Sequence, residues 1–232
     1  MTQMTADAVA QSVRVSATTL NLLRECERCF WLHLHGIRRP EGPEGPWPTI
    51  ARGLDTVISH YCAQYRDQHV LPPLLFDHLR GRLVTARVDS YVDADTGLTL
   101  VDRLDDCLEV AGGLFAPIDH KPRGWAPNGV LDADRLQLDV YALLLAENGY
   151  SLAGCGVLVY YVPVDGELHQ GVPFRVHVHE VDTDAERART WLRRARAVLD
   201  LPNPPEAAPD CGYCGRALLA ETMADKIETA VQ

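Results

Sequence analysis

The sequence has no apolar run of the roughly eighteen residues that cross a membrane, and its N-terminal segment MTQMTADAVAQSVRVS lacks the basic start and apolar core of a secretion signal. We therefore expect a soluble, cytoplasmic protein with no membrane partner. An excess of positive charge is also missing, since the net charge is −10. This argues against a general nucleic-acid coat protein, although a local basic strip could still hold phosphates beside metal-binding carboxylates.

Internal repeats and low-complexity tracts are absent as well. The chain has 232 residues, of which 47% are hydrophobic, and this is enough to bury one substantial core. We expect a single domain over residues 1–232. In a reducing compartment its seven cysteines are better explained as metal ligands or buried apolar side chains than as a disulfide framework.

Helical periodicity is found on both sides of a central group of strands. The predicted helices run from the N-cap Ser16 to near Gly36, over 50–65, after Pro73, over 132–148, from Thr183 or Asp184 to about Leu199, and after CGYCGR. Residues 38–48 (RRPEGPEGPWP) predict a loop. Residues 87–121 predict a three-stranded meander, and 156–164 and 173–181 predict two more strands. This order indicates an α/β core.

Two segments, LVDRLDDCLEV and LFAPIDHKPRG, contain aspartates and a lysine that could form one metal-dependent site. Asp119 and Lys121 are two residues apart on a predicted strand, so their side chains share a face. The turn at residues 111–113 folds the preceding strand back, which can bring Asp105 close. A hard cation such as Mg²⁺ takes oxygen ligands and keeps several waters, and an adjacent lysine can orient one of them. The pattern favours cleavage of phosphodiesters.

The cysteines contain two CxxC pairs, Cys26 with Cys29 and Cys211 with Cys214. Two such pairs can complete a four-thiolate site for zinc or for an iron-sulfur cluster. Residues 16–36 and 205–218 would then form a clasp that joins the two ends of the chain, and metal binding would stabilise the fold. Two unrelated pairs are the alternative. The simplest explanation of Cys62, Cys107 and Cys155 is burial in the core.

The two acidic strands, the following QLDVY helix, and the segments ECERCFWL and DCGYCGR resemble the RecB-like branch of the PD-(D/E)XK nuclease superfamily. Within it, the chain resembles the iron-sulfur exonucleases of CRISPR adaptation. The resemblance spans nearly the whole chain. It implies a restriction-endonuclease-like α/β core, with a mixed central sheet flanked by helices and with both termini clasped by a four-cysteine metal site.

The resemblance also implies roles for individual residues. Asp105 and Asp119 would be ligands of Mg²⁺ or Mn²⁺, and the carbonyl of His120 would be a third ligand. Lys121 would lie beside the attacking water. His120 stands where a tyrosine is common in the family.

Other positions match the family less closely or act at the edge of the site. Gln137 and Tyr141 project from one helical face and could position DNA or the lysine. Asp102 replaces a family glycine, which leaves it as an alternative metal ligand. A histidine in an early helix often completes such sites, and Asp55 and His60 are the two candidates for this place.

These patterns predict a metal-dependent DNA nuclease, an exonuclease or a DNA-end-processing enzyme, that acts on single strands or duplex ends. The cysteines would carry a structural [4Fe-4S] cluster, as the resemblance implies, with Zn²⁺ as the alternative. A second hypothesis is a non-catalytic DNA-binding or scaffold subunit of a larger DNA-processing assembly, and a third is a redox sensor. DNA repair, CRISPR adaptation and antiviral defence all stay open as biological settings.

Overall fold

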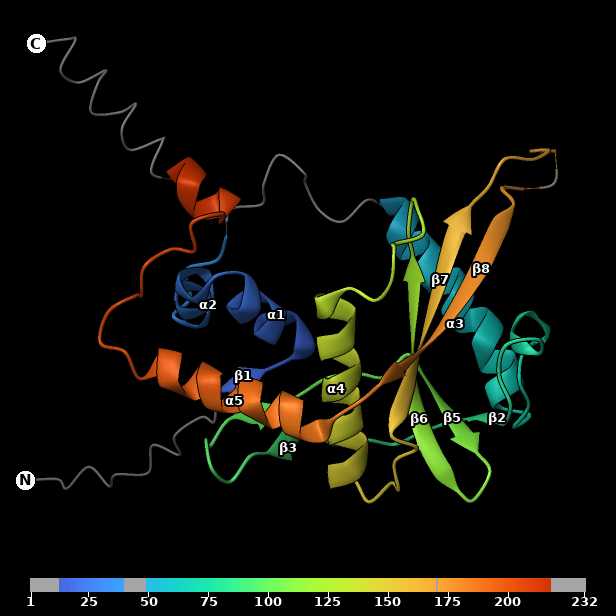
Figure 1. The fold of residues 1–232 in the computed structure, drawn as a ribbon, viewed down its shortest axis with the longest axis horizontal. Helices are drawn as coiled ribbons and strands as arrows, with labels where there is room; N and C mark the ends of the chain where they lie inside the picture. The colour runs from blue at the N-terminus through green and yellow to red at the C-terminus, as the bar shows by residue number, and fades with distance from the viewer. Residues whose placement is uncertain (1–12, 40–48, 170, 218–232) are drawn as a thin grey trace, which may run out of the picture.

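The computed structural model describes residues 13–39, 49–169 and 171–217, and its centre is a five-stranded mixed sheet in the order β2-β5-β6-β7-β8 (Figure 1). These strands are β2 (Arg82–Val84), β5 (Asp106–Val110), β6 (Leu114–Pro122), β7 (Cys155–Pro163) and β8 (Phe174–Asp182). Only the β6–β7 pair is parallel, and the other neighbours in this sheet are antiparallel. The parallel pair needs a crossover, which a helix provides.

Helices cover both faces of this sheet (Figure 1). The crossover helix α4 (Asp132–Glu147) contacts β6 and β7 on one face, and α3 (Thr49–Arg66) contacts β6 and β2 on the other. α1 (Ala17–Glu25) and α5 (Ala185–Leu199) pack against α4. The fold is therefore a layered α/β structure with a mixed central sheet, as predicted.

Two apolar clusters correspond to the two faces. The larger one joins α1, α4 and α5 to one side of β7, and the smaller one joins α3 to the other side of the sheet. Strand alternation explains the division, because Leu158 and Tyr160 belong to the first cluster whereas Val157 and Val159 belong to the second. Ile118 of β6 is fully buried in the second cluster, so Asp119 faces the side of α4.

The helix predicted from Ser16 to near Gly36 is two helices, α1 and α2 (Glu27–Leu34), and this part of the prediction was wrong. Ser16 caps α1, with its hydroxyl accepting from the Thr19 amide. Cys26 separates the helices in an extended conformation (φ −163°, ψ 111°). Its amide closes α1 on Leu22, and its carbonyl accepts from Phe30 in α2. The break allows Cys26 and Cys29 to face the C-terminal segment together.

The three-stranded meander predicted for residues 87–121 was also wrong. β5 and β6 form a hairpin, but β3 (Tyr91–Val92) and β4 (Thr99–Leu100) lie in a separate small sheet of order β1-β4-β3. β1 (Arg14–Val15) pairs in parallel with β4. Leu100 is buried in the large cluster beside α1 and α4, so apolar packing holds this hairpin away from the central sheet.

The remaining predicted elements agree in type, with short differences at their ends. α3, α4 and α5 occupy the predicted helical segments, and Asp184 is the N-cap of α5. The element after Pro73 is a single 3₁₀ turn (Pro73–Leu75). Residues 212–217 are helical, and the rest of the last predicted helix, within 218–232, lies outside the described residues. Residues 40–48 of the predicted loop also lie outside them. In the described ranges, none of the helices has the length and apolar character needed to cross a membrane.

Candidate active site

A cleft of about 730 Å³ opens where β6 ends. Its walls come from the start of α1, from the N-terminal part of α3, and from the first turns of α4. Four acidic or basic side chains of the sequence prediction line it, namely Asp55, Asp105, Asp119 and Lys121. The hairpin places Asp105 here, since Asp106 pairs with Ile118 in the β5–β6 register. Asp105 accepts a hydrogen bond of 3.0 Å from the backbone amide of His120 through Oδ2.

Lys121 is held by two acceptors in this cleft. Its Nζ donates to Asp119 Oδ1 at 3.0 Å and to Gln137 Oε1 at 2.8 Å. Gln137 in turn donates to the hydroxyl of Tyr141 at 2.6 Å. Burial and the nearby carboxylates raise the pKa of Tyr141 well above its usual range, so the phenol keeps its proton. The glutamine and the tyrosine therefore fix the direction of the ammonium group.

Asp119 is fully buried, at 0% exposure. Burial raises the pKa of its carboxyl to about 7, against the opposing effect of Lys121 and with a further increase from Asp105. Although Asp119 Oδ2 lies 2.9 Å from Lys121 Nζ, it has no hydrogen-bond partner of suitable direction among the residues that the structure describes. The Lys121 ammonium offsets part of the cost of burying this oxygen, and a bound metal ion would offset more of it.

The donor set fits a hard divalent cation. Asp119 Oδ2 has only the Lys121 ammonium beside it, at 2.9 Å and without a well-directed hydrogen bond. Asp105 is an exposed carboxylate just before β5, and both residues line one cleft. Mg²⁺ and Mn²⁺ prefer such oxygen ligands and keep part of their water shell, for which the cleft has room. The residues present therefore match the ion that the sequence predicts.

Of the two candidates on α3, Asp55 is electrostatically coupled to these groups. Partial burial and the charge of Asp105 raise the pKa of Asp55, while Lys121 and His120 oppose the rise. His60 also lines the cleft, one turn further along the helix. The structure thus brings Asp55 into the carboxylate group.

Both carboxylate oxygens of Asp102 accept hydrogen bonds from the backbone. Its Oδ2 accepts from the Ala17 amide at 2.8 Å, and its Oδ1 accepts from the Arg103 amide at 2.9 Å. Both oxygens are used by backbone groups, so the side chain anchors the start of α1 beside the cleft.

The side chain of His120 points to the opposite face of β6 from Asp119. Its Nε2 lies 3.1 Å from Asp106 Oδ2, and its Nδ1 lies 3.0 Å from the Tyr161 hydroxyl. Cys62 Sγ approaches Nε2 at 3.8 Å. Burial alone would lower the pKa of His120, but the hydrogen bonds to Asp106 and Cys62 raise it to about 10. This buried cluster fixes the backbone between Asp119 and Lys121.

One cleft residue was missed by sequence reasoning. Arg123 lines the cleft next to Lys121 and pairs with Asp134 of α4. Side chains two residues apart on a strand share a face, so the pattern that groups Asp119 with Lys121 also includes Arg123. This spacing could have identified Arg123 from the sequence.

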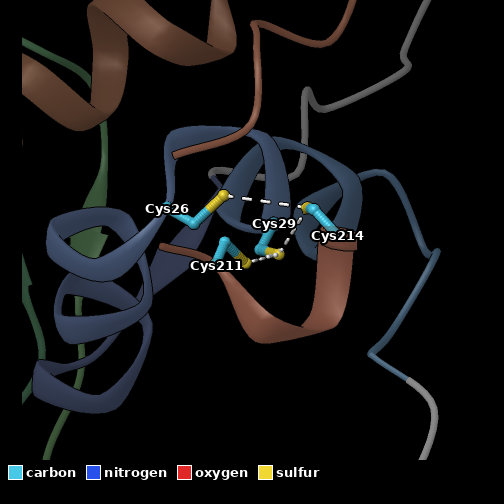
Figure 2. A group of neighbouring side chains, drawn as sticks. All are labelled: Cys26, Cys29, Cys211 and Cys214. Atoms are coloured by element: carbon cyan, nitrogen blue, oxygen red, sulfur yellow. Dashed lines mark hydrogen bonds between the residues drawn. The ribbon is translucent and has the colours of Figure 1, made fainter. Parts of the chain in front are cut away.

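The four predicted cysteines come together at the other end of the molecule (Figure 2). Cys29 Sγ lies 3.6 Å from Cys211 Sγ and 3.5 Å from Cys214 Sγ, and Cys26 Sγ lies 3.9 Å from Cys214 Sγ. All four sulfur atoms lie within 4.8 Å of one another. The two ends of the described chain are therefore joined at a site that can hold a metal.

The surroundings act on the four thiols in opposite directions. Partial burial alone would raise the pKa of Cys211, but hydrogen bonds from the Cys214 backbone and from neighbouring thiols lower it to about 7. Burial raises the pKa of Cys29 and Cys214, and for Cys214 the hydrogen bonds with neighbouring thiols raise it further. Arg39 hydrogen-bonds to Cys29, and its guanidinium carbon lies 4.2 Å from the centre of the Tyr213 ring. The Ala208 amide donates to Cys26 Sγ at 3.5 Å. Such donors offset the negative charge of a thiolate site.

Comparison with known proteins identifies one family. The family model described as the PD-(D/E)XK nuclease superfamily matches residues 59–217, from α3 to just beyond Cys214. A solved structure titled "Crystal structure of SSO0001" is similar to the chain, with a TM-score of 0.45 and 17% identity over 85% of this chain and 80% of that one. The search of curated proteins finds no significant match.

Proposed function

The chain belongs to the PD-(D/E)XK nuclease superfamily, and from this premise we propose that it is a divalent-metal-dependent DNA nuclease that hydrolyses phosphodiester bonds in the cleft at the end of β6. The single observation that carries the proposal is the state of Asp119. This carboxylate is fully buried, and the Lys121 ammonium lies beside both of its oxygens but makes a well-directed hydrogen bond only to Oδ1. Such an arrangement is costly for a structural carboxylate and suits a cation ligand.

We assign Asp105 and Asp119 as carboxylate ligands of Mg²⁺ or Mn²⁺, with Asp55 as the third side chain and the His120 carbonyl as a further oxygen. The bound ion would supply charge neutralisation and a more acidic water. We assign this place to Asp55 rather than to His60, because the charges of Asp105 and Lys121 act on Asp55.

Lys121 would orient the attacking water and stabilise the negative charge that develops on the phosphate. Its ammonium is already fixed by Asp119 and Gln137, so little reorganisation is needed during the reaction. Tyr141 keeps Gln137 in place through a 2.6 Å hydrogen bond. In-line attack would leave a 5′-phosphate and a 3′-hydroxyl, as in the RecB-like branch that the sequence resembles.

The charge of the cleft makes metal a condition of substrate binding. Five aspartates line it (55, 105, 106, 119 and 134), against Arg103, Lys121, Arg123 and the buried His120, whose raised pKa favours its protonated form. A phosphate backbone would be repelled from this surface until a divalent ion neutralises part of the charge. We propose that DNA ends or single strands enter only the metal-loaded cleft.

For the cysteine centre we propose a single tetrahedral ion, with Zn²⁺ as the best candidate. A zinc ion with bonds of about 2.3 Å places its thiolates about 3.8 Å apart. Three of the sulfur pairs lie 3.5, 3.6 and 3.9 Å apart, and all four atoms lie within 4.8 Å of one another. A [4Fe-4S] cluster binds each cysteine to a separate iron, which would hold the sulfur atoms further apart. The site would be structural and would take no part in hydrolysis.

A second candidate function is that of a non-catalytic DNA-binding or scaffold subunit within a DNA-processing assembly. The net charge of −10 favours it, because a free enzyme with this charge is repelled by DNA at long range. The incompletely hydrogen-bonded carboxylate of Asp119 and the fixed Lys121 favour catalysis.

The test is Mn²⁺-dependent cleavage of end-labelled single- and double-stranded DNA by the intact protein beside the Asp119→Ala variant, both prepared without oxygen. We expect cleavage by the intact protein only, with product ends that report polarity. Absence of cleavage by both, with metal still bound to the cysteines, would reject the nuclease and support the scaffold function. Metal analysis and a visible spectrum of the same samples distinguish zinc from an iron-sulfur cluster.

A further inference from the structure

Arg123 stands two residues beyond Lys121, immediately after the end of β6. Its backbone amide donates to the Tyr161 carbonyl at 3.0 Å, so the chain is still paired with β7 at this position. Lys121 and Arg123 therefore lie on the same face, roughly 6.6 Å apart along the strand. Both line the cleft.

The guanidinium of Arg123 is held in one orientation. Its Nη2 donates to both oxygens of Asp134, at 2.8 and 2.7 Å. The Tyr160 hydroxyl donates to Asp134 Oδ2 at 2.8 Å, which fixes the carboxylate in turn. The Arg123 guanidinium carbon also lies 5.4 Å from the centre of the Tyr160 ring. Asp134 and Tyr160 are both buried, so the cation rests on a rigid base.

This ion pair leaves part of the guanidinium unused. One nitrogen, Nη2, makes both contacts to Asp134, whereas an arginine can present five N–H donors. The Nε of Arg123 is buried and has no hydrogen-bond partner among the described residues. The side chain as a whole is 27% exposed at the cleft. The N–H donors that Asp134 does not use can therefore bind the oxygen atoms of a ligand.

We propose that Arg123 binds the backbone phosphate next to the scissile phosphate, and that Asp134 is its positioning residue. The inference rests on the proposed function, because Lys121 is taken to mark the scissile phosphate. The spacing between Lys121 and Arg123, two residues along β6, then corresponds to the spacing between two neighbouring phosphates of the nucleic-acid strand. Arginine suits this task because its planar group can form paired hydrogen bonds to phosphate oxygens.

The test is a binding series with a single-stranded oligonucleotide in which one linkage at a time is a neutral methylphosphonate. Dissociation constants are measured with Ca²⁺ in place of Mg²⁺, so that binding is read without a need for cleavage. For the wild-type protein we expect neutralisation of one linkage, adjacent to the scissile one, to weaken binding about tenfold. For Arg123→Gln we expect the unmodified strand to bind about tenfold more weakly, and the same methylphosphonate to add less than about twofold.

Arg103→Gln is the matched control, since Arg103 lines the same cleft but lies outside the Asp134 network. In the Arg103→Gln variant, the methylphosphonate at the sensitive linkage should still weaken binding about tenfold, as in the wild type. Arg123→Lys should bind with intermediate affinity, because a point charge replaces the planar group. If Arg123→Gln leaves Asp134 buried and unpaired and fails to fold, the Arg123→Gln/Asp134→Asn double variant removes that charge and replaces it in the series.

The proposal is overturned if the methylphosphonate penalty in Arg123→Gln equals that in the wild type, if no single linkage is sensitive, or if the strand does not bind. A result that rejects the Arg123 subsite can be told apart from a result that rejects the nuclease activity. Cleavage by the intact protein together with an unchanged penalty rejects the subsite alone. A selective penalty without any cleavage in Mg²⁺ keeps the subsite and rejects hydrolysis.

Discussion

The cleft at the end of β6 and the cysteine centre each bring several potential metal ligands together, carboxylates in the cleft and cysteine sulfurs at the centre. The two sites differ in exposure and in the groups that surround these ligands. In the cleft, Asp119 is buried with one oxygen lacking a hydrogen bond, and the neighbouring Asp105 is exposed. At the cysteine centre, four sulfur atoms lie within 4.8 Å of one another and receive support from Arg39 and the Ala208 amide. The first set leaves positions for water and substrate, and the second is closed.

The difference indicates that the cleft serves the reaction and that the cysteine centre serves the stability of the fold. An open set of oxygen ligands can hold an ion that also contacts a substrate, whereas four thiolates fill a tetrahedral ion. The cleft is built on adjacent strands of the sheet, while the cysteine centre joins segments separated by 182 residues in the case of Cys29 and Cys211. Changes in the cleft should therefore affect the reaction, and changes at the cysteines should affect the fold.

The largest effect is expected for Lys121→Ala. The cleavage rate should fall by about 10³-fold or more, because the cation beside the reacting phosphate is lost. The melting temperature should change little, since a carboxyl with a pKa near 7 can take up a proton when its partner is removed. Single-turnover kinetics and a thermal melt measure the two effects. Cleavage within tenfold of the wild-type rate would remove Lys121 from the mechanism.

The Cys211→Ser/Cys214→Ser variant should show the opposite pattern. Its bound metal should be lost, and the free energy of unfolding should fall by about 3 kcal/mol or more, because metal binding is coupled to folding. Metal content and urea denaturation are the measurements. Cys155→Ser is the control, since this half-buried cysteine lies on β7 outside the four-sulfur group. A double variant as stable as the wild type would show that the two ends are joined without the metal.

A smaller effect is expected for Asp119→Asn in protein free of divalent ions in the cleft. Burial raises the folded pKa of Asp119 from 3.8 to about 7, so the folded state binds this proton more tightly than the unfolded state. The stability that results is present below pH 4 and is lost as the pH rises to 7. Asparagine carries no such charge.

Asp119→Asn should therefore match the wild type more closely at pH 5 and exceed its stability at pH 8 by about 2 kcal/mol. Urea denaturation at the two pH values, without added Mg²⁺ and without chelator, measures this difference. Added Mn²⁺ should reduce it by binding the wild-type carboxylate. The same difference at both pH values would show that the charge of Asp119 does not limit stability.

The smallest effect distinguishes the two candidates on α3. Asp55→Asn should lower the cleavage rate about tenfold and raise the Mn²⁺ concentration needed for half-maximal activity, because one carboxylate is removed. His60→Gln should change both quantities by less than about twofold. A metal titration of the cleavage rate compares them. The reverse ranking would give the third position to His60.

Much of the cleft could be predicted from the sequence because its parts are close along the chain. Alternation on a strand placed Asp119 and Lys121 on one face, and the glycine turn at 112 and 113 returned the chain toward Asp105. Both glycines have a positive φ, at 83° and 70°, which side chains with a Cβ rarely adopt. The CxxC spacing similarly indicated a shared cysteine site, because two thiolates at this spacing can reach one metal.

Other features were set by contacts between distant segments. Asp102, the alternative ligand in the sequence, accepts hydrogen bonds from backbone amides through both oxygens, and one of these amides belongs to α1. The break at Cys26 interrupts a pattern that reads as one helix. The small sheet forms because β1 pairs with β4, a partner that local periodicity does not reveal.

The sequence alone determined the positions of most helices and strands, which side chains share a strand face, and which cysteines occur in pairs, because these depend on periods of two and of about 3.6 residues and on local spacing. Tertiary structure decided the raised pKa of Asp119, the effect of the Asp105 and Lys121 charges on Asp55, and the anchoring of Arg123 on Asp134. These depend on desolvation and on which distant groups packing brings within a few ångströms, and local sequence carries no measure of either.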